Sequence, residues 1–331
     1  MSVGGDNGNN GDSRCTPANF SLQDKTIWIA GEHGMVGRAL TRALEQRGHS
    51  KIIKLPREAV DFRDQAAVLR FMREAKPHVV VVAAGKVGGI QANLNAPSAF
   101  LYDNTMIAAN IIEAARLAGV EKLLYLGSSC QYPADAPLPL QPQSLLSGAF
   151  EPSNAPYALA KSLGVALCQT YRAAYGCDFI SALPCNLYGP YDRFDAELSH
   201  VIPALMMKAH QAKLSGAHSF EAWGSGAPRR EFLYVDDLAE ACLILLERYS
   251  AAAPVNIGTG YSISIRDLAA QIAQCVGFTG EIVWNKQKPD GVYDKTLDVS
   301  AITQIGWRPN YSLIEGLENT YSWFLKRIRK S

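Results

Sequence analysis

The stretch TIWIAGEHGMVG at residues 26–37 decides the fold of this chain. It begins with a short apolar run that predicts a buried strand, and the residues after it show helical spacing. Gly31, Gly34 and Gly37 stand three residues apart between the two. Gly31 permits a tight turn, Gly34 lets the backbone approach a pyrophosphate, and Gly37 lets the helix pack on the strand. This order predicts the first strand, glycine turn and helix of a dinucleotide-binding domain.

Strand and helix patterns alternate along the first half of the chain. Further strands are predicted at residues 51–55, 79–84, 122–127 and 179–183, and helices at 107–118 and 156–175. The run at 79–84 contains only Val and Ala, which is typical of a strand buried on both faces. The alternation predicts an α/β fold, with a Rossmann-type doubly wound parallel sheet over residues 22–185.

The ends of the chain differ from this pattern. Residues 1–21 are rich in Gly, Asn, Asp and Ser without an apolar core, which predicts a disordered N-terminal tail. After residue 186 Gly, Pro and aromatic residues cluster, and shorter apolar segments follow at 201–212, 238–249, 255–257, 265–276 and 313–327. We expect residues 186–331 to form mainly a smaller, mixed α/β substrate-binding lobe over the carboxyl ends of the sheet.

Composition excludes several classes of protein. A formal net charge of +1 over 331 residues gives no basic stripe, so no nucleic-acid partner is expected. The seven cysteines include no Cys-x-x-Cys pair, so neither a metal site nor a disulfide framework is predicted. No apolar run reaches membrane-spanning length. These features predict a cytoplasmic protein with no membrane partner.

The segment YALAK at residues 157–161 places Tyr157 and Lys161 one helical turn apart on one face. A nearby cation favours phenolate, so we expect Lys161 to lower the pKa of Tyr157 from its usual value of about 10. Such a phenol can exchange a proton with a carbonyl/alcohol pair, with the Ser128 hydroxyl as a second hydrogen-bond partner. The spacing alone is more often an exposed helical pair, and its place after a dinucleotide-binding motif favours catalysis.

The end of the second strand predicts the type of dinucleotide. An adenine-ribose 2′-hydroxyl selects an acidic residue there, whereas a 2′-phosphate selects arginine. The segment KLPR at residues 54–57 has no carboxylate, and Arg57 can bind a phosphate in a fork. Asp61 is expected beside the adenine. NADP(H) is therefore the predicted cofactor, and the alternative for Arg57 is a solvated loop residue.

These motifs resemble the extended short-chain dehydrogenase/reductases, and among them the GDP-L-fucose synthases. The resemblance runs from about residue 26 to residue 324 and includes AGKVGGI (84–90), GSSC (127–130), NLYGP (186–190), SHVIP (199–203), WGSG (223–226), REF (230–232) and KPDG (288–291). It implies that GDP-4-keto-6-deoxy-mannose is epimerised at C3 and C5 and then reduced at C4 by NADPH. It also implies a GDP-sugar as the substrate and a homodimer.

The resemblance assigns catalytic roles to Ser128, Cys130, Tyr157, Lys161 and His200. The C4 ketone acidifies the protons on C3 and C5, and the Ser128 and Tyr157 hydroxyls would stabilise the enolate that forms. Cys130 would act as the base near positive groups, and His200 would return the proton. Without the resemblance, a buried structural cysteine and a core or capping histidine are the commoner interpretations.

Two larger sets of residues also follow from the resemblance. The cofactor set is Gly31, His33, Gly34, Met35, Val36, Gly37, Arg57, Asp61, Ala84, Lys86, Tyr157, Lys161, Pro184, Asn186, Leu187 and His200. The substrate set is Asn186, Val201, Lys208, Trp223, Arg230, Asp290 and Lys295. Arg230 suits a diphosphate, Trp223 offers a stacking face unless it is a core aromatic, and Asp290 suits hydroxyl groups.

Three positions depart from the family pattern. His33 replaces an expected arginine, which leaves the phosphate to Arg57 and Lys54, and Gly85 replaces an expected alanine. Residues 292–294 (VYD) place an acid before Lys295 where a base is usual. The sugar could therefore differ, for example a colitose-type or heptose-type GDP-sugar.

Other activities remain open on this fold. A nucleotide-sugar 4-epimerase would not need Cys130 with His200 and would prefer an acid near residue 55. A 4,6-dehydratase needs an acid beside the catalytic serine, where Ser129 and Cys130 offer none. A non-catalytic NADP-sensing protein usually lacks the tyrosine or the lysine, and both are present here.

Overall fold

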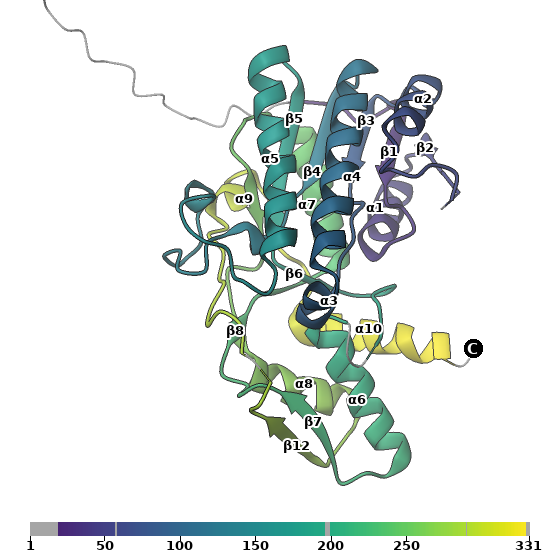
Figure 1. Ribbon diagram of the computed structural model, residues 1–331. Coiled ribbons are helices and arrows are strands. Elements are labelled where there is room, and N and C mark those ends of the chain that lie inside the picture. The colour runs from purple at the N-terminus through teal and green to yellow at the C-terminus, as the bar shows by residue number, and fades with distance from the viewer. Residues whose placement is uncertain (1–18, 57, 196–198, 289, 329–331) are drawn as a thin grey trace, which may run out of the picture.

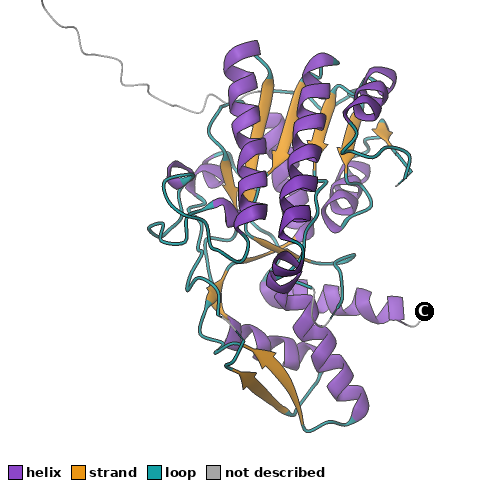
Figure 2. Cartoon of the chain, in the orientation of Figure 1, coloured by secondary structure: helices purple, strands orange, loops and turns teal. Residues whose placement is uncertain are grey.

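The computed structural model describes residues 19–56, 58–195, 199–288 and 290–328. In this part of the chain a six-stranded parallel sheet, in the order β10-β5-β4-β3-β1-β2, has helices on both faces (Figures 1 and 2). Its strands are β1 (Ile27–Ala30), β2 (Ile52–Ile53), β3 (Val79–Val82), β4 (Lys122–Leu126), β5 (Asp178–Pro184) and β10 (Val255–Ile257). The predicted α/β doubly wound sheet is confirmed.

Helices cover the two faces of this sheet in two groups. One face carries α2 (Gln65–Ala75), α4 (Pro97–Leu117) and α5 (Ala155–Tyr175), and α1 (Met35–Gln46) packs against α7 (Val235–Arg248) on the other. Because both faces are covered, β1, β3 and β4 are buried along their whole length. The strand order reverses between β1 and β3, which predicts a ligand site at the carboxyl ends of these two strands.

The second lobe lies below the sheet in Figure 1 and contains three two-stranded pairs. They are β6 (Asn186–Tyr188) with β9 (Phe232–Tyr234), β7 (Ser219–Trp223) with β12 (Glu281–Asn285), and β8 (Arg229–Arg230) with β11 (Ile263–Ser264). Its helices are α6 (Val201–Ser215), α8 (Ile265–Val276) and α10 (Leu313–Ile328). The apolar faces of α6 and α8 pack together and form a separate core.

The two cores are interleaved along the sequence. α7, β10 and α9 (Ser300–Gln304) follow residue 186, yet their buried side chains belong to the core around the sheet. The chain thus returns to the six-stranded sheet and adds β10 beside β5. The second core therefore takes in only part of residues 186–331.

The predicted tail ends too late in the sequence. The Phe20 N–H donates to the carbonyl oxygen of Glu247 at 2.9 Å, and the Lys122 Nζ lies 5.2 Å from the centre of the Phe20 ring. Phe20 packs against the sheet core next to the buried Leu22. The prediction that residues 19–21 belong to the tail is wrong, because an aromatic side chain finds apolar surface there. Residues 1–18 lie outside the described residues.

The predicted helix at 107–118 is the second half of α4, which begins ten residues earlier at Pro97. α2 and the short α3 (Ile90–Asn95) have no counterpart among the predicted elements. Within the described ranges, none of the helices combines the length and the apolar character that a membrane crossing requires.

Candidate active site

Three of the predicted catalytic side chains meet beyond the carboxyl end of β4. The Ser128 hydroxyl accepts a hydrogen bond from the Cys130 N–H at 3.2 Å, and the Gln131 side chain accepts one from the Ser128 N–H at 2.6 Å. This reciprocal capping starts a short 3₁₀ helix, Ser129–Gln131. It fixes the backbone that carries both Ser128 and Cys130.

The first two turns of α5 supply Tyr157 and Lys161. The Tyr157 phenol is within hydrogen-bonding reach of the Ser128 hydroxyl. The Lys161 Nζ lies 6.0 Å from the centre of the Tyr157 ring and donates a 2.8 Å hydrogen bond to the Leu126 carbonyl oxygen. The structure therefore brings Ser128, Tyr157 and Lys161 together at the end of β4, as the spacing predicts.

Burial decides the protonation of these two groups. Burial raises the pKa of Tyr157, the neighbouring Cys130 raises it further, and the hydrogen bond with Ser128 lowers it. Burial also lowers the pKa of Lys161 to about 8. The prediction that Lys161 lowers the tyrosine pKa is wrong here, because burial of the phenol is the largest cause of its shift and Lys161 is not among the causes. A protonated phenol is a proton donor, which is the form that carbonyl reduction uses.

Arg230 is the positive group beside Cys130. Burial lowers the pKa of the Arg230 guanidinium, and its electrostatic contact with Cys130 raises it, as do three nearby carboxylates. The Arg230 side chain is held by a 2.6 Å hydrogen bond to the Val292 carbonyl oxygen. The structure thus places a fixed guanidinium in electrostatic contact with the Cys130 thiol.

His200 stands at the N-terminus of α6, directly before Val201. Its ring is exposed to solvent, but enough protein surrounds it that burial lowers its pKa. In the described part of the chain no hydrogen bond joins His200 to Cys130, so its role as the second proton carrier stays a prediction.

The glycine turn fits a dinucleotide. Gly31 has a φ of +95°, and a Cβ there would lie 2.7 Å from the Ala84 backbone nitrogen, so the turn packs directly on the end of β3. A Cβ at Gly37 would overlap the Gly31 carbonyl oxygen. No side chain caps α1 at Gly34, and its first turn, which Met35 and Val36 open, carries no acid. The positive end of the helix is thus open to a pyrophosphate.

The end of β2 is tied to this turn. The Glu32 carboxylate accepts a hydrogen bond from the Leu55 N–H at 2.6 Å, and the His33 Nε2 lies 2.9 Å from the Leu55 carbonyl oxygen, to which it can donate. Lys54 pairs with Glu45 of α1 at 3.2 Å. Arg57 lies outside the described residues. The role of Glu32 was not predicted, because its partner is 23 residues away and leaves no local signal.

A row of charges links two other predicted cofactor residues, Asp61 and Lys86. Arg63 pairs with Asp61 at 2.8 Å and with Asp103 at 3.4 Å, and Lys86 pairs with Asp103 at 3.2 Å. The hydrogen bonds from Arg63 lower the pKa of Asp61 to about 2. The Lys86 N–H donates to the Asn104 side chain at 2.8 Å.

The chain beyond β5 carries the remaining cofactor residues. Pro184 ends β5 beside Ile257, and Asn186 and Leu187 begin β6. The Asn186 side chain donates to the Glu231 carbonyl oxygen at 3.0 Å.

Glu231 is a structural residue that the sequence did not reveal. Its buried carboxylate accepts hydrogen bonds from the Gly260 N–H at 2.7 Å and the Leu297 N–H at 2.9 Å. Burial raises its pKa. These two hydrogen bonds hold the backbone between Arg230 and β9 to the loops that contain Gly260 and Leu297.

An open hollow of about 660 Å³ in the second lobe is lined by Lys208, Trp223, Lys288 and neighbouring parts of α6 and β7. The ammonium groups of Lys208 and Lys288 each lie 4.7 Å from the centre of the Trp223 ring. Trp223 is half-buried and faces two cations, so it is not a core aromatic. Asp290 accepts hydrogen bonds from the Ser225 N–H at 2.9 Å and from its hydroxyl at 2.7 Å.

Asp294 is the acid that departs from the family pattern, and its side chain forms hydrogen bonds with neighbouring loop residues. Its carboxylate accepts hydrogen bonds from the Thr296 N–H at 3.0 Å and hydroxyl at 2.7 Å, and from the Ser262 hydroxyl at 3.2 Å. The Arg229 Nε lies 3.8 Å away. Lys295, the next residue, is half-buried beside this network.

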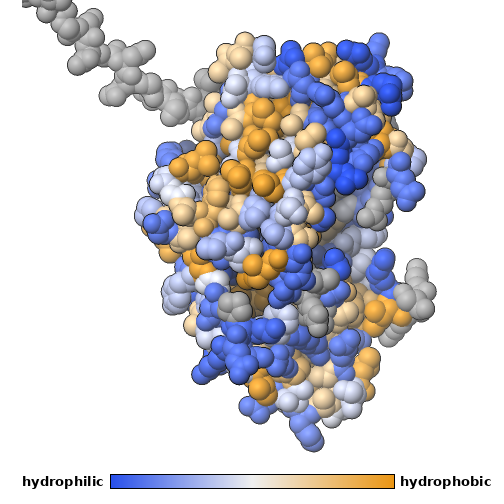
Figure 3. Space-filling view, in the orientation of Figure 1, coloured by the Kyte–Doolittle hydropathy of each residue, from blue (hydrophilic) through white to orange (hydrophobic). Residues whose placement is uncertain are grey.

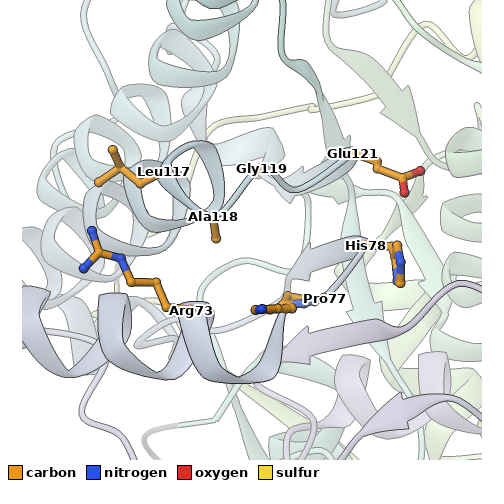
Figure 4. Close-up of a pocket in the computed structure, with 8 residues that line it drawn as sticks. Arg73, Pro77, His78, Leu117, Ala118, Gly119 and Glu121 are labelled. Carbon is orange, nitrogen blue, oxygen red and sulfur yellow. The ribbon is translucent and has the colours of Figure 1, made fainter.

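A second pocket of about 450 Å³ lies at the opposite end of the sheet. Figure 4 shows around it Arg73 of α2, Pro77 and His78 before β3, Leu117 at the end of α4, and Ala118, Gly119 and Glu121 between α4 and β4. None of the predicted site residues that the structure describes lines this pocket. It lies at the amino ends of the strands, whereas α/β sheets bind ligands at the carboxyl ends.

Comparison with known proteins agrees with this geometry. The chain is 46% identical over 310 residues to GDP-L-fucose synthase 1 of Arabidopsis thaliana, which covers 93% of this chain and 96% of that protein. A GDP-L-fucose synthetase from Naegleria fowleri bound to NADP has a TM-score of 0.86 at 28% identity, covering 96% and 98% of the two chains. A GDP-6-OMe-4-keto-L-xylo-heptose reductase from C. jejuni has a TM-score of 0.88 at 33% identity, covering 93% and 99%. A family model, described as the NAD dependent epimerase/dehydratase family, matches residues 27–258. The chain belongs to the NAD dependent epimerase/dehydratase family.

Proposed function

We propose that this chain is an NADP-dependent oxidoreductase that epimerises GDP-4-keto-6-deoxy-D-mannose at C3 and C5 and reduces it at C4 to GDP-L-fucose. The observation that carries the proposal is the meeting of Ser128, Cys130 and Tyr157, with Arg230 beside the thiol. The high similarity to a GDP-L-fucose synthase over nearly the whole chain supports the same activity.

The glycine turn at Gly31, Gly34 and Gly37 would hold NADPH, which would supply the hydride for the C4 carbonyl. Tyr157 is kept protonated by burial, so its phenol can give a proton to the C4 oxygen. Ser128 offers a second hydroxyl at the same point. Lys161, which lies one helical turn after Tyr157 and donates to the Leu126 carbonyl oxygen, would bind the nicotinamide ribose.

Epimerisation depends on Cys130 and His200. The C4 ketone makes the protons on C3 and C5 acidic, and Cys130 is the base that removes them, with the Arg230 guanidinium in electrostatic contact. The enolate oxygen is then held by the same two hydroxyls, Ser128 and Tyr157. His200 returns the proton from the N-terminus of α6.

The GDP group occupies the second lobe in this proposal. Lys208 and Lys288 beside Trp223 supply two positive charges and a stacking face, which suit a nucleotide diphosphate. A related GDP-sugar is the second candidate, because a heptose reductase shares the fold at 33% identity. Asp294 is engaged in its own loop, so we assign it no direct contact with the sugar.

We also propose a cytoplasmic homodimer. Figure 3 shows apolar side chains over α5, and large apolar side chains on α4 and α5 are exposed, among them Tyr102 at 60% and Leu159 at 49%. Together they offer a surface that a second copy of the chain can cover.

The activity is tested by incubating the purified protein with NADPH and GDP-4-keto-6-deoxy-D-mannose while the absorbance of the reduced nicotinamide is followed. We expect NADPH oxidation and a product that co-elutes with GDP-L-fucose. A keto-heptose GDP-sugar serves as the comparison substrate, and a faster reaction with it would move the assignment to the second candidate. Interconversion of UDP-glucose and UDP-galactose without added NADPH would instead indicate a 4-epimerase.

A further inference from the structure

A tight turn follows β6 and contains a tyrosine where glycine is the normal residue. The Asp192 N–H donates to the Gly189 carbonyl oxygen at 3.3 Å, which closes a four-residue turn, and Tyr191 has a φ of +70°. Proline at the second position and a positive φ at the third define a type II turn. A bulky side chain strains the backbone at that position, and such strain concentrates at functional sites. A role of the Tyr191 ring is therefore expected in the contacts that it makes.

The Tyr191 ring packs between the two lobes. The Arg38 guanidinium of α1 lies 4.5 Å from the ring centre, and the Trp323 ring of α10 lies 4.9 Å from it. α1 covers the dinucleotide-binding sheet, whereas α10 belongs to the lobe below it (Figure 1). The ring thus joins elements from both sides of the active site.

Two predicted functional segments lie next to the residues of this stack: the glycine turn beside Arg38, and the segment that carries His200 after Tyr191. The Arg38 Nε donates to the His33 carbonyl oxygen at 3.1 Å, so the arginine that stacks on Tyr191 also holds the glycine turn. On the other side the chain runs from Tyr191 toward His200. The Ser199 hydroxyl, next to His200, donates to the carbonyl oxygen of Arg193, which is two residues after Tyr191, at 2.5 Å.

We propose that Tyr191 is a positioning residue that couples the glycine turn to the segment carrying His200. A guanidinium stacked on an aromatic ring is restricted to fewer conformations. The Tyr191 ring therefore holds the Arg38 side chain in the position from which it donates to the His33 carbonyl oxygen. The inference rests on the proposed function, since it takes the turn as the NADPH site and His200 as a proton carrier. It adds that cofactor binding and the placement of His200 depend on one side chain outside the predicted cofactor and substrate sets.

The test uses Tyr191→Gly, which relieves the backbone and removes the ring, and Tyr191→Phe, which keeps the ring. Lys76→Gly is the matched control, because Lys76 also has a left-handed backbone (φ 44°) but lies at the far end of the sheet. The Kd for NADPH is measured by fluorescence, alongside the melting temperature and solvent-deuterium incorporation into the sugar.

We expect Tyr191→Gly to change the melting temperature no more than Lys76→Gly does, yet to raise the Kd for NADPH about 3- to 10-fold and to slow deuterium incorporation. Tyr191→Phe and Lys76→Gly should bind NADPH like the wild type. Wild-type binding by Tyr191→Gly would overturn the proposal, as would equal losses in the glycine and phenylalanine variants. If the wild type binds NADPH but converts no keto-sugar, the proposed function fails while the binding comparison still decides the coupling to the glycine turn.

Discussion

The Lys161 ammonium donates a 2.8 Å hydrogen bond to the Leu126 carbonyl oxygen, and both residues are buried. This bond ties the second turn of α5 to the last residue of β4. Tyr157 lies one turn earlier on the same helix, and Ser128 lies two residues beyond Leu126. Together with the 3.4 Å hydrogen bond from the Gln131 side chain to the Ser162 hydroxyl, this bond fixes the position of Tyr157 relative to Ser128.

The burial of Lys161 predicts a pH dependence of stability. Its pKa is about 8 in the folded protein and 10.5 for the free side chain, so between these pH values the unfolded state binds more protons. The contribution of Lys161 to the free energy of unfolding therefore rises with pH. Relative to Lys161→Met, the wild type should gain about 2–3 kcal/mol in free energy of unfolding between pH 7 and pH 10. Urea titrations across this range measure the difference, and a constant difference would argue against a depressed lysine pKa.

Arg57 and the missing carboxylate at the end of β2 predict the preference between NADPH and NADH. The wild type should favour NADPH in kcat/KM, and Arg57→Ala should reduce that preference by about 10- to 150-fold through loss of a charge-assisted fork. Lys51→Ala is the control, because Lys51 pairs with Asp24 at 3.3 Å and has no predicted contact with the cofactor. A wild type that favours NADH would refute this reading of Arg57.

The first described residues predict where the chain can be shortened. Removal of residues 1–18 should leave the melting temperature and turnover unchanged. Phe20→Ala should lower the free energy of unfolding by about 1–2 kcal/mol, because the half-buried ring packs on the sheet core. Ser21→Ala, at an exposed neighbour, is the control. Equal stability of Phe20→Ala and wild type would show that this packing contributes nothing.

Much of the fold could be predicted from periodicity. The helix at 265–276 and the strand at 255–257 have the predicted bounds, because their apolar spacing matches one face of a helix and a buried strand. Periodicity did not show that this strand joins the first sheet, since pairing with β5 is a long-range contact.

The candidate site was less visible in the sequence. Spacing was enough to bring Tyr157 and Lys161 together on one helix. The direction of the tyrosine pKa depends on burial, which the sequence does not display. Glu32, Glu231 and Tyr191 act through partners far along the chain, so no local pattern could reveal them.

The central claim is that one site performs two chemistries, with Tyr157 protonating C4 and Cys130 moving protons at C3 and C5. The most direct measurement is solvent-deuterium incorporation into the sugar, by mass spectrometry and NMR, for wild type, Tyr157→Phe and Cys130→Ser with NADPH in deuterated water. Wild-type product should carry deuterium at both carbons. Tyr157→Phe should slow NADPH oxidation about 10²- to 10⁴-fold through loss of a general acid. Cys130→Ser should lose the label, because an alcohol is a far weaker acid than a thiol, and any product should be a 4-reduced sugar that is not epimerised. Full deuterium exchange at C3 and C5 by Cys130→Ser would contradict the account.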